Sequence, residues 1–258
     1  MNITKEKLRE LLTRGTVHGC PAHRYVAAKL IVKARIPAFL KFSTPHYRVW
    51  LHPSALSYCL YLDRDYFHHD EAVMRNILRP GDTFVDVGAN IGGWTLYASP
   101  LVGSSGTVYA FEPHPKVARY LTENVRLNGF ANIQLFEAAA GDANGVSCLS
   151  DRQNDANNNV MASGPIPVKV VRLDSVIPDT PIRLLKLDAE GYELPALAGA
   201  REVLSRTQFV YFECWETYFK AYGYSTRHLL DLLRGEGFRI DIPADHGEEF
   251  HENLLAYR

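Results

Sequence analysis

The stretch Asp82-Thr-Phe-Val-Asp-Val-Gly-Ala-Asn-Ile-Gly-Gly-Trp-Thr95 decides the fold. Its first part, residues 83–87, is a short apolar and β-branched run, which predicts a strand buried on both faces of a parallel sheet. Glycines follow, and Asn90 among them could cap a helix that runs through Trp94. A strand that turns on glycines into a helix presents backbone N–H groups and the positive helix end at one edge of the sheet, where a ligand can bind.

Strand-like and helix-like segments alternate through the rest of the chain from residue 80. Further strands are predicted at residues 106–111, 133–139, 168–173, 182–187 and 208–212, and helices at residues 115–128, 194–204 and 226–234. Residues 238–242 and 254–257 could pair as a closing hairpin. Residues 143–165 interrupt the alternation and, with many Asn and Asp, predict a loop. The pattern predicts an α/β fold with a mostly parallel sheet, helices on both faces and an antiparallel edge.

The beginning of the chain differs from the rest in charge. Residues 1–50 carry ten Lys or Arg and two Glu, although the whole chain has a formal net charge of −1. We expect residues 1–79 to form a mostly helical extension to a domain at residues 80–258, and this extension could make a homodimer. Residues 22–36 predict a basic helix, whose lysines we expect to be solvated on a packing helix rather than bound to an acidic lipid surface.

Cysteine usage and hydropathy indicate the compartment. The four cysteines, Cys20, Cys59, Cys148 and Cys214, form no CxxC pair and have no metal-ligand spacing, which is typical of a reducing environment. The N-terminus is charged where a secretory signal would be apolar, and no apolar run reaches the roughly 18 residues that a membrane span needs. We therefore expect a cytoplasmic protein without a membrane span.

Acidic residues follow several predicted strands, at the edge where open parallel sheets bind ligands. Glu112 ends the strand after the glycine turn, in the position where a carboxylate can accept hydrogen bonds from both hydroxyls of a ribose. Asp142 follows the next strand and could bond an adenine amino group. Each carboxylate could instead cap a helix. Together they favour a cofactor that contains a nucleoside.

The spacing of the glycines argues against a dinucleotide. A dinucleotide fingerprint reads G-x-G-x-x-G, whereas this turn reads Gly88-Ala-Asn-Ile-Gly-Gly93, with Asn90 in the place of the glycine that lets a pyrophosphate approach. A cofactor without phosphates fits better, which disfavours a nicotinamide-dependent oxidoreductase. A non-catalytic binding protein is disfavoured because two acidic residues, Asp188 and Glu190, follow another buried strand.

Five motifs, in this order, resemble those of the FkbM-type methyltransferases. They are Val85-Asp-Val-Gly-Ala-Asn-Ile-Gly-Gly93, Phe111-Glu-Pro-His-Pro115, Ala140-Gly-Asp142, Leu173-Asp-Ser-Val176 and Leu185-Lys-Leu-Asp-Ala-Glu-Gly-Tyr-Glu193. The resemblance implies a class I methyltransferase (Rossmann-like) fold of seven strands, with S-adenosylmethionine as the methyl donor. It implies donor binding by Asp86, Gly88, Ala89, Asn90, Gly92, Glu112, Pro113 and Asp142. It also implies transfer to oxygen, commonly to a hydroxyl of a sugar or a secondary metabolite.

Transfer to a hydroxyl requires a group that accepts the hydroxyl proton. Asp188 is the first candidate, because it ends the strand expected beside the glycine-turn strand. Lys186 lies two residues earlier and therefore on the same face, where it could orient Asp188 or form an internal ion pair. Glu190 follows on the next turn. These three residues are the predicted catalytic group.

Two alternatives for the proton remain open. Asp188 and Glu213 end adjacent predicted strands and could share an oxygen-ligated Mg²⁺ that binds acceptor oxygens. A histidine could be the base instead, with His114 closest to a predicted site residue and His68, His69, His246 and His251 in segments of uncertain position.

The acceptor is expected to meet aromatic side chains. Trp215 and Tyr218 follow the strand that carries Glu213, and their rings could stack on a sugar or a polyketide. We therefore predict a small-molecule or glycan acceptor near Glu213, Trp215 and Tyr218, with N-methyl transfer to a small molecule as the alternative reaction. Nucleic acid is not expected as a partner, because no N-P-P-Y type base-methylation motif occurs.

Overall fold

The computed structural model describes residues 16–17, 20–21, 30, 40–150, 158–242 and 251–258. The basic helix predicted at residues 22–36 lies outside the described residues except for Leu30, and so does His246. Nearly all of the predicted domain from residue 80 onward is described.

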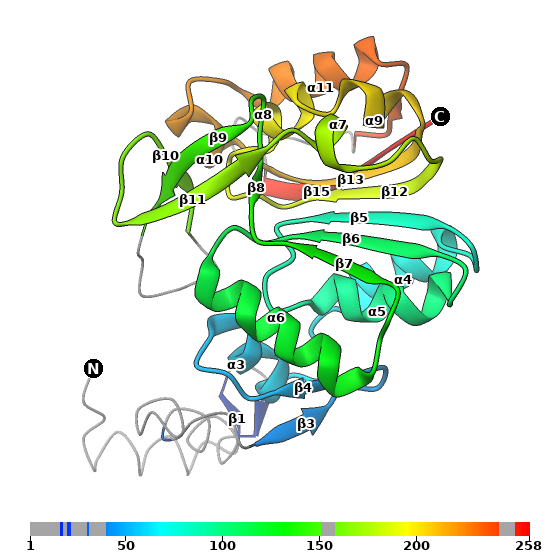
Figure 1. Cartoon of the computed structure of the whole chain (residues 1–258), viewed down its shortest axis with the longest axis vertical. Helices are drawn as coiled ribbons and strands as arrows, with labels where there is room; N and C mark the ends of the chain where they lie inside the picture. Colours follow the sequence, from blue (N-terminus) through cyan, green and yellow to red (C-terminus); the bar gives the residue numbers. More distant parts are fainter. Residues whose placement is uncertain (1–15, 18–19, 22–29, 31–39, 151–157, 243–250) are drawn as a thin grey trace.

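The centre of the molecule is a seven-stranded sheet in the order β14-β15-β13-β12-β5-β6-β7 (Figure 1). Strand β5 (Thr83–Val87) pairs in parallel with β6 (Thr107–Phe111) on one side and with β12 (Ile182–Leu187) on the other. Beyond them lie β7 (Ile133–Phe136) and β13 (Thr207–Trp215), also parallel. The chain therefore continues from β5 to β6 and β7 on one side, and later returns to β12 and β13 on the other side of β5. This reversal of strand order is the topological switch point, where open sheets bind ligands. The predicted sheet is confirmed.

A hairpin closes the sheet at the β13 side. Strand β15 (His251–Tyr257) runs antiparallel both to β13 and to the edge strand β14 (Arg239–Ile240). The predicted hairpin is confirmed, and the antiparallel strand lies second from the edge. Its register places Asn253 opposite Glu213.

Helices cover both faces of the sheet (Figure 1). Helices α4 (His68–Ile77), α5 (Gly93–Val102) and α6 (Pro115–Asn128) lie on one face, and α7 (Leu173–Val176), α8 (Glu193–Ala198), α9 (Arg201–Ser205) and α11 (Thr226–Gly235) on the other. A short helix, α10 (Glu216–Ala221), follows β13. The single helix predicted at residues 194–204 is two helices, because the chain breaks at Gly199, where a side chain would overlap the carbonyl of Gly141.

A second, four-stranded sheet corrects two predictions. It contains β8 (Ala139–Ala140), β9 (Gly145–Leu149), β10 (Val160–Met161) and β11 (Ile166–Val171). The strand predicted at residues 133–139 ends at Phe136, since the chain then leaves the main sheet for β8. The loop predicted at residues 143–165 contains β9 and β10, whose pairing the Asn-rich composition concealed.

The later part of residues 1–79, from β4 (Arg48–Trp50) onward, packs against the main sheet and the helices α5 and α6. The described part of the whole segment contains the short pairs β1 (Thr16–Val17) with β2 (Cys20–Pro21) and β3 (Lys41–Ser43) with β4, and then α3 (Ala55–Leu62) and α4. The backbone N–H of Trp50 donates to Asn124 of α6 at 2.9 Å. Buried side chains of this segment form one apolar core with Phe84 of β5 and Trp94 of α5. The domain boundary at residue 80 stays a prediction, and strands accompany the helices of the segment.

Two further features concern the helices and the cysteines. Over the described ranges, no helix has both the length and the apolar character that a membrane crossing requires. Cys59, Cys148 and Cys214 are free thiols.

Candidate active site

The glycine turn after β5 is held against the neighbouring strands on both sides. The backbone N–H groups of Gly88 and Ala89 both donate to the carbonyl of Phe111, at 3.0 and 2.9 Å. Gly88 has a positive φ of 77°, and a Cβ there would overlap the carbonyl oxygen of Asp188 at the end of β12. Only glycine therefore allows β5 and β12 to meet this closely.

Asn90 has a different role from the predicted helix cap. Its φ is 51°, a left-handed conformation that Asn tolerates better than most residues. Its side-chain oxygen accepts from the next backbone N–H, that of Ile91, at 2.8 Å. The cap position of α5 is Gly92 instead. This geometry directs the backbone N–H of Asn90 toward the end of β6.

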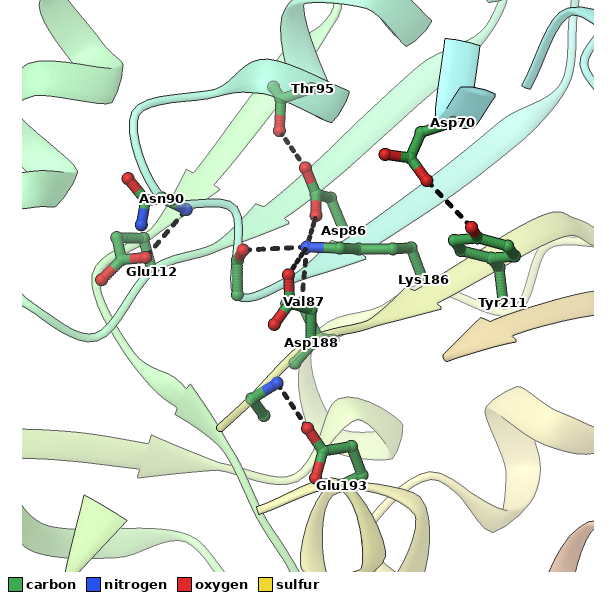
Figure 2. Close-up of polar contacts among 12 residues, drawn as sticks. Asp70, Asp86, Val87, Asn90, Thr95, Glu112, Lys186, Asp188, Glu193 and Tyr211 are labelled. Carbon is green, nitrogen blue, oxygen red and sulfur yellow. Dashed lines mark hydrogen bonds and ion pairs between the residues drawn. The ribbon is translucent and has the colours of Figure 1, made fainter. Parts of the chain in front are cut away.

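Glu112 accepts a hydrogen bond from that N–H (Figure 2) and a second one from the backbone of His114. Its Oε2 accepts from the backbone N–H of Asn90 and its Oε1 from that of His114, both at 2.8 Å. Burial raises the pKa of Glu112 to about 7, although both hydrogen bonds act in the opposite direction. The carboxyl group is thus fixed at the end of β6, and each oxygen retains lone pairs for a ligand hydroxyl.

Lys186 lies at the centre of the polar network between β5 and β12 (Figure 2). Its Nζ is 3.2 Å from Asp86 Oδ1 and 3.5 Å from Asp188 Oδ2, and it donates to the carbonyl of Gly88 at 2.9 Å. Asp86 Oδ2 accepts from the Thr95 hydroxyl at 2.6 Å. Burial alone would lower the pKa of Lys186, but the two carboxylates outweigh burial and hold that pKa above its usual value.

The turn after β12 presents Asp188. Its backbone N–H donates to the carbonyl of Val87 at 3.1 Å, and its side chain is 44% exposed, whereas that of Lys186 is 5% exposed. Glu193, which is buried, stabilises the turn by accepting from the backbone N–H of Ala189 at 2.7 Å. Glu190 adopts a φ of 54°, a conformation unfavourable for its residue type. The turn thus holds Asp188 at the surface of the network.

Glu213 lies beside Asp188, because the parallel register of β12 and β13 aligns Leu187 with Phe212. Burial raises the pKa of Glu213 to about 9, and the nearby carboxylates of Asp188, Glu190 and Glu193 add to the shift. We therefore expect Glu213 to carry its proton at neutral pH. Both residues are partly buried, and the two carboxyl groups differ in that Asp188 contacts the Lys186 ammonium.

A cavity of about 350 Å³ opens at the carboxyl ends of these strands. Among its lining residues are most of the predicted site: Gly88, Ala89, Asn90, Glu112, Pro113, Lys186, Asp188, Glu190 and Glu213. Asp86 lies behind Lys186, to which it is paired, and Gly92 packs against Leu96 and Leu121. The structure therefore brings residues from four strands of the main sheet to one cavity.

Three further predicted residues do not line this cavity. Asp142 is exposed, and residues 138–140 line the wall near the second sheet instead. Trp215 and Tyr218 pack on each other with ring centroids 4.1 Å apart, and neither lines the cavity. Of the histidines considered as a base, His114 lines the cavity but also caps α6, where its Nδ1 accepts from the backbone N–H of Lys116.

Several lining residues come from segments that the sequence had not connected to the site. The N-terminal segment contributes Leu56, Cys59, Tyr66 and Phe67, and the second sheet contributes Leu149 and Val160. No local motif marks these residues, because their position depends on packing between distant parts of the chain. Within the described residues, no group of three or more His, Cys, Asp or Glu is placed to hold a metal ion.

A sheet with this strand order, a glycine turn after its central strand and an acidic residue at the end of the next strand defines a class I S-adenosylmethionine-dependent methyltransferase. The sequence profile described as the methyltransferase FkbM domain matches residues 86–240. The chain therefore belongs to the FkbM methyltransferase family, which confirms the resemblance stated above.

Three curated relatives are methyltransferases with acceptors of different kinds. The 2-O-methyltransferase NoeI of Sinorhizobium fredii is 26% identical over 60% of this chain and 72% of its own length. The 31-O-demethyl-FK506 methyltransferase FkbM of Streptomyces tacrolimicus is 29% identical over 75% of this chain and 85% of its own. The hexuronic acid methyltransferase AglP of Haloferax volcanii is 28% identical over 51% and 55%, respectively.

The fold is shared with solved structures. A methylase structure from Clostridium thermocellum matches with a TM-score of 0.50 at 14% identity, over 74% of this chain and 94% of that one. At this identity the likeness shows the fold.

Proposed function

We propose that the protein transfers the methyl group of S-adenosylmethionine to a hydroxyl group of a carbohydrate or natural product, with Asp188 as the residue that accepts the hydroxyl proton. The observation that carries this proposal is that Asp188, Glu112 and the glycine turn line one cavity. The relatives NoeI and FkbM are named for O-methyl transfer, and AglP is named for a sugar acid, hexuronic acid. These relatives support a hydroxyl acceptor.

Donor binding is assigned to the carboxyl ends of β5 and β6. Glu112 would accept hydrogen bonds from the ribose hydroxyls, because both of its oxygens are held by backbone N–H groups and face the cavity. The turn at Gly88 and Asn90 would contact the methionine part, with Pro113 beside the ribose. The adenine would lie toward residues 138–140, near but not on Asp142.

The chemistry requires alignment and removal of one proton. S-adenosylmethionine supplies a methyl group on a sulfonium sulfur, which keeps the electron pair of the broken C–S bond when the acceptor oxygen takes the methyl carbon. Asp188 accepts the proton that the acceptor oxygen loses and later releases it to water. Lys186 acts through Asp188 as a positioning residue, because its ammonium fixes the carboxylate 3.5 Å away while Asp86 and Gly88 hold the ammonium.

A shared Mg²⁺ between Asp188 and Glu213 does not fit these residues. The Lys186 ammonium lies 3.5 Å from Asp188 Oδ2 and would repel a cation bound there, and within the described residues no third His, Cys, Asp or Glu is placed to complete a metal site. We therefore derive no step through a metal ion. A homodimer through the N-terminal segment stays a prediction.

Calorimetry and turnover test the proposal separately. S-adenosylhomocysteine should bind the wild-type protein, and Asp188→Asn should keep that affinity while kcat falls by about a hundredfold or more, because proton acceptance contributes about this much. Asp179→Asn, a fully exposed carboxylate at 100% side-chain exposure, is the control and should change neither quantity. No binding of S-adenosylhomocysteine would contradict donor use, and an active Asp188→Asn would remove Asp188 from the mechanism.

A further inference from the structure

A second cavity, of about 250 Å³, is lined by Lys186 and Asp188 but not by the glycine turn. The two cavities share six lining residues: Tyr66, Phe67, Trp94, Lys186, Asp188 and Glu213. The two cavities are therefore adjacent, and the proposed base, Asp188, lines both. A molecule in the second cavity would reach Asp188 while a donor occupied the first.

A carboxylate from the N-terminal segment is fixed in this second cavity. Asp70 of α4 accepts a hydrogen bond from the hydroxyl of Tyr211 of β13 at 2.9 Å, although 141 residues separate them (Figure 2). The side chain of Asn253 also hydrogen-bonds Tyr211. The ring of Trp94 packs on that of Tyr211 with centroids 4.9 Å apart. Tyr211 is thus held on three sides and orients Asp70.

The available hydrogen-bonding groups define what this cavity can bind. The Tyr211 proton is used on Asp70, so the carboxylate retains lone pairs that can only accept. A ligand that satisfies Asp70 must therefore bring donors, as hydroxyl groups do. The aromatic rings of Tyr66, Phe67 and Trp94 supply apolar faces beside these polar groups, a combination that suits a sugar ring.

The charge of the second cavity selects against anions. Asp70, Asp188 and Glu213 are three carboxyl groups in its lining, and Lys186 is the one basic side chain there among the described residues. Its charge is already opposed by the buried Asp86. A carboxylate or phosphate on the ligand would thus meet a site without a spare positive charge.

We propose that the second cavity is the acceptor subsite, that it binds an uncharged polyhydroxyl ring, and that Asp70 accepts a hydrogen bond from a hydroxyl near the one that is methylated. This inference rests on the proposed function and narrows its acceptor class. Asp70 lies outside residues 86–240, the part that matches the family profile. Acceptor choice in this protein would then depend partly on the N-terminal segment.

The test compares neutral and acidic acceptors. Wild-type protein with radiolabelled S-adenosylmethionine is offered methyl glycosides of neutral hexoses and the corresponding uronates, and the best neutral substrate is then used with the variants. We expect neutral glycosides to be preferred. Asp70→Asn should raise KM for the neutral substrate about tenfold, the loss expected for a hydrogen bond to a charged group. Its kcat should stay within about threefold, and its affinity for S-adenosylhomocysteine should not change.

A matched control removes a charge nearby without touching either cavity. Asp65→Asn, on the exposed chain just before α4, should leave KM unchanged. Tyr211→Phe should raise KM in the same direction as Asp70→Asn, because the carboxylate loses the group that orients it. Normal circular dichroism and melting temperature establish that each variant is folded.

Two results would overturn the inference while leaving the proposed function intact. One is methylation by Asp70→Asn with the wild-type KM, and the other is a wild-type preference for uronates. A wild-type protein that binds S-adenosylhomocysteine but methylates no hydroxyl compound would contradict the proposed function itself, and the inference with it.

Discussion

Lys186 and Asp86, which pair across the parallel register of β12 and β5, form a buried ion pair at 3.2 Å. The side chain of Asp86 is completely buried and that of Lys186 is 5% exposed. A charge in this environment depends on its partner, because water cannot replace the lost interaction.

Lys186→Met should therefore destabilise the protein strongly. The substitution leaves the Asp86 carboxylate buried with only the Thr95 hydroxyl as a partner, and we expect the free energy of unfolding to fall by about 3–5 kcal/mol. Urea denaturation measures this change. The double variant Asp86→Asn with Lys186→Met should recover part of the loss, since no unpaired charge remains. A single variant as stable as the wild type would contradict the interpretation.

Glu112 should make donor affinity depend on pH. Its pKa is about 7 in the free protein, and the ribose hydroxyls would bind its charged form. Protons therefore compete with the ligand, and the Kd of S-adenosylhomocysteine should rise about tenfold as pH falls from 8 to 6. Calorimetry at several pH values measures the slope. Glu112→Gln should bind more weakly with a Kd that is nearly constant over this range, and an equal slope in both proteins would exclude Glu112 as its cause.

Ionisation of Glu213 should decrease the free energy of unfolding as pH rises. Its pKa is about 9 in the folded protein and near 4.5 in an unfolded chain, so between these values the folded state binds more protons than the unfolded state. Stability is then highest below about pH 4.5 with respect to this group and decreases by at most about 1.4 kcal/mol per pH unit up to pH 9. Chemical denaturation at pH 6 and 8 measures the trend. Glu213→Gln should show a shallower slope, and identical slopes would assign the dependence to other groups.

Gly88→Ala tests the contact between the turn and β12. Gly223 is a matched control, because both glycines have a φ of 77° but a Cβ at Gly223 would meet nothing within 4 Å. Gly223→Ala should cost about 1 kcal/mol, the usual penalty for this backbone conformation. Gly88→Ala adds the overlap with the carbonyl of Asp188, so it should cost at least about 2 kcal/mol more and weaken binding of S-adenosylhomocysteine. Equal losses at both positions would show that the close approach is unimportant.

The sequence was sufficient to predict those parts of the site that depend on a few neighbouring residues. The strand before Gly88, the turn and the acidic end of β6 were predicted correctly, because β-branched residues and glycines restrict the backbone over a few residues. Lys186 and Asp188 were placed together because side chains two residues apart on a strand share a face.

The remaining site depended on where the chain goes in space. The contact of Asp142 with the adenine stays a prediction, because β7 ends at Phe136 and Asp142 follows β8 of the second sheet rather than a strand of the main sheet. Asp70 and Tyr211 were missed because they meet through the packing of α4 on β13. The sequence of either segment alone contains no sign of that contact.

The direction of β15 has a practical consequence for handling the protein. Strand β15 starts beside Trp215, at the end of β13 that lies near the cavities. It finishes at the other end of β13, where the backbone N–H of Arg258 donates to the carbonyl of Gln208. An affinity tag or surface linker attached after Arg258 would thus point away from both ligand openings. Deleting residues 251–258 would instead remove a strand from the sheet and Asn253 from the second cavity.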